Sequence, residues 1–118
     1  MLLLQTYDYQ GFKVVLTSAT WFKKVLDPVF GHPEVKPYQS QLRRSIRTPE
    51  YVYQSIKDPR SKLFFHTITK SDFSSYFLVV VVKYVLELKG MVGYVSTVMI
   101  NRRLPKRSKL VWEKKIST

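Results

Sequence analysis

The sequence predicts an α+β fold, in which N-terminal helices pack on one face of an antiparallel β-sheet. The clearest helical periodicity lies in residues 33–56, and residues 62–100 have the pattern of strands joined by short connections. Short connections favour antiparallel hairpins, and helices followed by strands indicate an α+β arrangement. A chain of 118 residues is long enough for one hydrophobic core, so we expect a single domain over 1–118.

The helices are predicted from two start signals. Pro33 suits a first helical turn, and the apolar positions after it recur every three or four residues. These positions are Val35, Tyr38, Leu42 and Ile46. They predict an amphipathic helix over 33–46. A polar cap, a proline and an acid follow in 48–50, which predicts a second short helix over 49–56.

The strands are predicted from apolar and β-branched runs between turn residues. Strands are expected at 11–16, 62–70, 76–85 and 93–100, with a turn at 71–75 and a possible edge strand at 109–114. Residues 18–30 show no clean period and stay unassigned. The opening residues 1–10 read as the start of the domain, because three leucines are too few for a secretory signal or an anchor. The longest apolar run is also too short to span a membrane.

The charge points to a polyanionic partner. Lysine and arginine number 20 against 8 acids, for a formal net charge of +12. Such an excess most often attracts phosphates, so RNA is the expected partner, and no membrane association is expected. The basic tail, 104–118, and the residues just before it hold much of this charge. The expected phosphate contacts are Arg102, Arg103, Lys106 and Arg107, and Tyr51, Tyr53 and Trp112 are candidates for stacking on bases.

Lys83 stands out as a charge within a core strand. Alternation places it on one face with Val79, Val81 and Val85. It therefore sits beside an acid, emerges at an edge, or faces a site that holds an anion. In the next strand the adjacent Ser96 and Thr97 point to opposite faces. Because sequence does not fix the register, we choose Thr97 as the hydroxyl beside Lys83 and keep Ser96 in reserve.

Histidine limits any acid–base mechanism, because the chain has only two. His32 precedes the proline that opens the first predicted helix, where the helix dipole favours anions, and it is either a site residue or a capping ring. His66, inside the first hairpin strand, is held in reserve. Arg43 and Arg44 lie on the polar side of the helix and are either phosphate ligands or a solvated face.

Several kinds of chemistry are disfavoured. The chain has no cysteine, no glycine-rich phosphate loop and no histidine pair at metal spacing, and its acids are scattered singly. No metal and no cofactor are therefore expected. A nuclease of this composition would be metal-independent, with the ribose 2′-hydroxyl as nucleophile, side chains as base and acid, and cations around the phosphate.

One family resemblance fits these residues. The string GHPEVKPYQSQLRRSIRTPEYVYQSIKDPRSKLFFHT, followed by LVVVVK and GYVSTVMI, resembles the phage-type members of the barnase, EndoU, colicin and RelE nuclease superfamily (the BECR fold) over about residues 31–103. The resemblance implies one or two helices on a four-stranded antiparallel sheet, and metal-independent RNA cleavage, often by a toxin. It matches His32, Lys83 and Thr97 to the family's helix histidine, strand lysine and later hydroxyl.

Together these observations predict a cytoplasmic, toxin-like endoribonuclease. His32 would act as base or acid, Lys83 with Arg43 or Arg44 would stabilise the phosphate, and Thr97 would position it. The alternative is a noncatalytic, basic nucleic-acid-binding module. A third possibility is an interaction protein whose basic face meets an acidic, antitoxin-like inhibitor. Convergence of His32, Lys83 and Thr97 in one cleft would favour the enzyme, and dispersal would favour the binding module.

Overall fold

Three long strands form the centre of the sheet. The computed structural model describes residues 1–68 and 76–115, and contains β4 (Ser61–Thr67), β5 (Phe77–Glu87) and β6 (Gly90–Asn101). Both neighbours of β5 pair with it in antiparallel fashion. Gly90 reverses the chain between β5 and β6 at φ +117°, a conformation that L side chains rarely adopt. The predicted strands are confirmed here; the predicted turn at 71–75 lies outside the described residues.

A hairpin adds two strands at one side. β1 (Leu2–Tyr7) and β2 (Lys13–Thr17) pair antiparallel, and Asp8 closes their turn by accepting the N–H groups of Gln10 and Phe12. β2 then runs parallel to β6, with Lys13 opposite Val92. The strand predicted at 11–16 is confirmed. β1 was not predicted as a strand.

Two further strands lie at the other side. β3 (Tyr51–Gln54) pairs with β4, and β7 (Leu110–Glu113) pairs with β3 at the edge, as predicted for 109–114. The helix predicted over 49–56 is wrong. The Thr48 hydroxyl bonds backward to the Arg44 carbonyl, and the Glu50 carboxylate bonds to Thr67, so neither side chain caps a helix. The Glu50 N–H donates to the Phe65 carbonyl and starts the sheet pairing.

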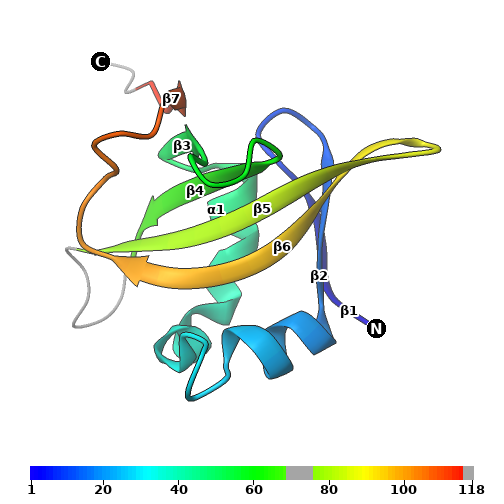
Figure 1. Ribbon diagram of the computed structural model, residues 1–118, viewed down its shortest axis with the longest axis vertical. Helices are drawn as coiled ribbons and strands as arrows, with labels where there is room; N and C mark the ends of the chain where they lie inside the picture. Colours follow the sequence, from blue (N-terminus) through cyan, green and yellow to red (C-terminus); the bar gives the residue numbers. More distant parts are fainter. Residues whose placement is uncertain (69–75, 116–118) are drawn as a thin grey trace.

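The described strands form one mixed sheet of seven, in the order β1-β2-β6-β5-β4-β3-β7 (Figure 1). The prediction of N-terminal helices on a four-stranded antiparallel sheet is therefore wrong, and so is the fold that the BECR resemblance implied. The physical reason is that β2 pairs in parallel with β6, and the segment at 110–113 pairs with the one at 51–54, so both pairings join parts of the chain that are far apart in sequence. Local sequence carries little information about such pairing.

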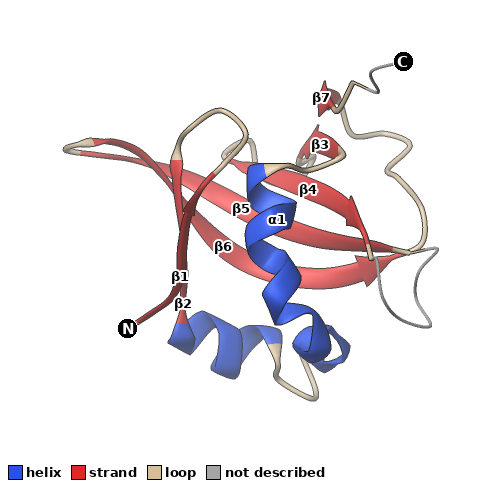
Figure 2. Ribbon diagram, turned by 180° about the vertical axis from the view of Figure 1, so that it is seen from behind, coloured by secondary structure: helices blue, strands red, loops and turns tan. Residues whose placement is uncertain are grey.

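Short helical segments cover one face of the sheet (Figure 2). They are η1 (Thr20–Val25, a π-helix), η2 (Pro33–Gln41, a 3₁₀ helix) and α1 (Leu42–Arg47). The helix predicted over 33–46 is helical, but only its end is α, because Pro37 has no N–H to donate and crowds the preceding turn. No helix in the described ranges is long and apolar enough to cross a bilayer.

The core lies between the helical layer and the sheet. Trp21, Leu42 and Ile46 pack against Val80 and Val82 in one buried cluster. We call this side of the sheet the helix face. The opposite side, the outer face, holds a smaller cluster centred on Tyr53, Phe65 and Val79. Leu104, in the connection between β6 and β7, packs on this smaller cluster and so brings the connection to the outer face at this point.

Candidate nucleic-acid interface

Lys83 and Thr97 both lie on the outer face. Val80 and Val82 belong to the helix-face cluster and Val79 to the outer cluster, so alternation puts Lys83 on the outer side. Thr97 stands directly opposite Val81, which shares that side. The prediction that Lys83 and Thr97 share a face is confirmed. A β-bulge between Val81 and Val82 sets this register, and Ser96 at the bulge donates its hydroxyl to the Val81 carbonyl.

Lys83 sits beside an acid, which was one of the predicted alternatives. Its Nζ lies 3.7 Å from Asp58 Oδ2, and its side chain is 39% exposed. The pKa of Asp58 is lowered, chiefly because the Arg60 N–H donates to the carboxylate, with further contributions from the Ser61 hydroxyl and the charges of Lys83 and Arg60. The charge of Lys83 is thus partly neutralised within the protein.

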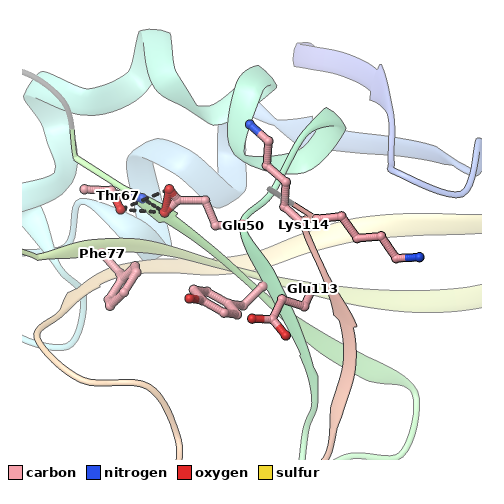
Figure 3. A pocket seen from close by; sticks show the side chains of 7 residues that line it. Glu50, Thr67, Phe77, Glu113 and Lys114 are labelled. Carbon is pink, nitrogen blue, oxygen red and sulfur yellow. Dashed lines mark hydrogen bonds between the residues drawn. The ribbon is translucent and has the colours of Figure 1, made fainter. Parts of the chain in front are cut away.

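A hollow opens at the β3–β7 end of the sheet. It has a volume of about 550 Å³, and is lined by Glu50, Tyr51, Thr67, Phe77, Glu113, Lys114 and Lys115. Glu50 is fixed inside it: its Oε1 accepts the Thr67 N–H at 2.9 Å and the Thr67 hydroxyl at 2.5 Å. Figure 3 shows the Glu50 carboxylate turned toward Thr67, with Glu113 lying apart from this pair. We call this hollow the platform pocket.

Aromatic rings form the floor of the platform pocket. Tyr51 and Phe77 meet edge to face with centroids 6.2 Å apart, and Phe77 meets the buried Phe65 at 5.8 Å in the same way. Such contacts hold a ring in one orientation. Tyr51 and Phe77 remain partly exposed, so each offers ring surface to the pocket. Partly exposed, fixed rings on a sheet are what an unpaired base stacks on.

Basic side chains surround this end of the outer face. Those from 102 to 115 are all exposed: Arg102, Arg103, Lys106, Arg107, Lys109, Lys114 and Lys115. In the described part of the chain, Arg60 and Lys83 are the only lysines or arginines within ion-pair distance of an acid. The cations of the basic segment 102–115 are therefore free to neutralise phosphates.

Several acids already have internal partners. Asp8 and Asp27 accept backbone N–H groups in turns, Glu50 holds Thr67, and Glu87 accepts the Tyr94 hydroxyl. The two backbone N–H groups that donate to Asp27 lower the pKa of its carboxyl group. The hydrogen bond to Glu87 raises the pKa of the Tyr94 phenol. These hydrogen bonds orient the carboxylates without removing their charge, and the surface stays positive because 20 lysines and arginines outnumber 8 acids.

His32 lies away from Lys83 and Thr97. His32 occupies the N-cap position of η2, on the helix side of the sheet, but its side chain makes no capping hydrogen bond. Its Nδ1 lies 3.6 Å from Glu34 Oε2. Its position follows from Gly31, where a Cβ would meet the Lys24 carbonyl oxygen at 2.3 Å, so the chain turns tightly against η1. The structure therefore does not bring His32, Lys83 and Thr97 into one cleft.

The other sequence-predicted residues are also dispersed. His66 shares the helix face with Phe64, and its Nδ1 lies 2.9 Å from the Thr67 carbonyl oxygen. Arg43 donates to the Gln5 carbonyl at the β1 edge, and the neighbouring Arg44 is exposed on α1. Of the predicted stacking residues, Tyr53 is buried and Trp112 packs on Tyr9 with centroids 5.0 Å apart. Tyr51 alone of the three lines the platform pocket.

No known family, curated protein or solved structure matches this chain. The site therefore depends on its geometry alone. Sequence reasoning missed Phe77 and the Glu50–Thr67 pair. Phe77 has the same parity as Val79 and Val81, so alternation already placed it on their face. The Glu50–Thr67 pair had no local signal, because the two residues come together only when β3 and β4 pair, and residues 49–56 were predicted to be helical.

Proposed function

We propose that this protein binds single-stranded RNA without cleaving it. The observation that carries the proposal is the platform pocket, where two fixed aromatic rings lie beside unpaired lysines. A base would stack on Tyr51 or Phe77, and phosphates would contact the basic segment 102–115. Duplex stacking hides base faces, so a ring platform favours single strands.

Glu113 supports RNA over DNA as the bound strand. Within the described residues its carboxylate has no hydrogen-bond or ion-pair partner, whereas Glu50 is fully occupied by Thr67. A ribose 2′-hydroxyl can donate to such a carboxylate, and deoxyribose cannot. A Glu113→Ala variant, which removes the acceptor, should therefore narrow the difference in affinity between RNA and DNA of the same sequence.

The endoribonuclease stays a prediction. Metal-independent cleavage needs a base, an acid and cations around one phosphate. The two histidines lie on the helix side, and Lys83 and Thr97 lie on the outer face. Incubation with total RNA plus EDTA should therefore leave the RNA intact. Cleavage that disappears in a His32→Ala variant would contradict the binding proposal and establish the enzyme.

Fluorescence anisotropy with a labelled RNA about ten nucleotides long tests the platform. Tyr51→Ala should weaken binding by about 1–3 kcal/mol, which is roughly 5- to 150-fold, because one stacked base is lost. Tyr7→Ala is the matched control, since Tyr7 is also an exposed strand tyrosine, at 55%, and lies on β1. Equal loss in both variants, or no binding at low salt, would overturn the proposal.

An acidic protein partner also stays a prediction. It would use the same cations as RNA, so it would compete with the labelled RNA in this assay. Its binding would be insensitive to Tyr51→Ala, because stacking belongs to nucleic acid.

A further inference from the structure

A second hollow lies on the helix side of the sheet, at the other end from the platform pocket. Its volume is about 280 Å³, near the lower end of the range for small-molecule sites. It is lined by Phe12, Pro59, Arg60, Lys62, Tyr84 and Met91. We call it the Phe12 pocket. Tyr84 belongs to the helix-face cluster, so this hollow is separate from the platform pocket.

Its walls suit a planar aromatic ring. Phe12 and Tyr84 meet with centroids 6.3 Å apart at 69°, so the Tyr84 ring fixes that of Phe12. Phe12 is 41% exposed and Met91 38%, so both present apolar surface to whatever enters. Thioether sulfur and aromatic rings make favourable contacts with planar ligands.

Two cations belong to the same pocket. Lys62 Nζ lies over the rings of Tyr9 and Tyr84, 5.9 and 5.5 Å from their centroids, and 3.3 Å from Gln10 Oε1. These contacts orient the ammonium and leave its charge uncompensated by any acid within ion-pair distance in the described ranges. Arg60 meets Asp58 through Nε only, and its side chain is 61% exposed.

The acid behind the pocket is already occupied. Asp8 is buried, and its carboxylate accepts the Tyr84 hydroxyl at 2.5 Å and the N–H groups of Gln10 and Phe12. Burial and this bond raise the pKa of Tyr84, so the phenol stays neutral. The groups that remain available to a ligand are apolar or positive.

We propose that this pocket, with its apolar walls and two cations, binds a nucleotide. The planar base would lie against Phe12 and Met91, and its phosphate would contact Lys62 and Arg60. This goes beyond the proposed strand binding, because it concerns a different hollow. The phosphorylated base has two sources, a free nucleotide or the 5′-phosphorylated end of an RNA strand.

Isothermal titration calorimetry of the full chain with adenosine monophosphate, adenosine, inorganic phosphate and a 5′-phosphorylated trinucleotide tests the inference. The monophosphate should bind about tenfold or more tightly than adenosine or phosphate, because it alone uses both the rings and the cations. Comparable monophosphate and trinucleotide affinity would indicate a free nucleotide. Binding of the trinucleotide alone would indicate a strand end.

Single substitutions test whether the nucleotide binds in the Phe12 pocket. Phe12→Ala and Lys62→Gln should each weaken this binding by about tenfold, while Tyr51→Ala and Tyr7→Ala should leave it unchanged. Thermal midpoints establish that each variant is folded. Absence of binding by every probe, or loss in Tyr51→Ala instead of Phe12→Ala, would overturn the inference. If Phe12→Ala still binds single-stranded RNA, the proposed RNA binding does not depend on the Phe12 pocket.

Discussion

The basic segment 102–115 and the basic helical surface carry the same kind of charge in different surroundings. Both expose lysines and arginines: Arg102, Arg103, Lys106 and Arg107 in the segment, and Lys23, Lys24, Arg44 and Arg47 on the helices. The segment lies beside the platform pocket and its aromatic floor. A hollow beside the start of α1 holds about 140 Å³ and is lined by leucines, polar side chains and Arg43, without an aromatic ring.

The difference teaches that charge alone does not define a nucleic-acid site. Cations attract a strand from any direction, but only rings fixed at an open pocket give its bases a place to stack. The two regions can therefore be separated by substitutions that remove equal charge from each.

The largest effect is expected from the basic segment. Changing Arg102, Arg103, Lys106 and Arg107 to Gln should weaken single-stranded RNA binding by about 100-fold or more near 0.1 M salt. The slope of log K against log salt should fall by about 2.8, since each phosphate contact contributes about 0.7. Anisotropy titrations at several salt concentrations measure both quantities.

The matched control removes the same charge from the helical surface. Changing Lys23, Lys24, Arg44 and Arg47 to Gln should weaken binding by less than about fivefold, through the general field alone. Equal losses in the two sets would show that RNA binding is not localised at the platform pocket.

An intermediate effect is expected within the platform pocket, where the two acids differ. Glu50→Ala removes the acceptor for the Thr67 N–H and hydroxyl, and should lower the free energy of unfolding by about 1–3 kcal/mol. Glu113→Ala removes an exposed carboxylate and should change the free energy of unfolding by less than about 0.5 kcal/mol. Urea unfolding measures both, and similar values would mean that Glu50 does not hold β3 and β4 together.

The smallest effect is expected at Asp58. Its pKa is lower in the folded protein than in the unfolded chain, so its contribution is present above the unfolded value and is lost as pH falls through the folded one. Asp58→Asn should flatten the fall in stability below about pH 4. Lys83→Gln should leave most of the loss of stability at low pH in place, because the Arg60 N–H is the main cause of the lowered Asp58 pKa. An identical profile in both variants would contradict this assignment.

The sequence predicted the centre of the sheet well. The apolar run at 77–82 and the glycine at the turn after β5 are typical of a buried hairpin. Alternation grouped Lys83 with Val79 and Val81, and the choice of Thr97 over Ser96 as the hydroxyl on that face agrees with the pairing of Thr97 and Val81. It failed at the edges. Thr48, Pro49 and Glu50 have the composition of a helix start, but their side chains bond to Arg44 and Thr67 instead.

The candidate site was predicted only in part. Tyr51 and the cations of 102–115 were candidates on residue type alone, and the structure leaves the cations exposed and Tyr51 partly exposed. Phe77 and Glu113 lie beside Tyr51 only because of the strand order: β7, which carries Glu113, pairs with β3, and only β4 separates β3 from β5, which carries Phe77. No residue near Tyr51 in the chain indicates those neighbours.

The sequence by itself determined the excess positive charge, the central hairpin and the residues that share a face with Lys83. These depend on composition and on the two-residue period of a strand, which are local properties. Tertiary structure decided that residues 51–54 pair with 110–113 in the sheet, that His32 lies away from Lys83, and that two rings meet at an open pocket. Each of these depends on hydrogen bonds and packing between segments far apart in sequence, where local propensity is too weak to choose the partner.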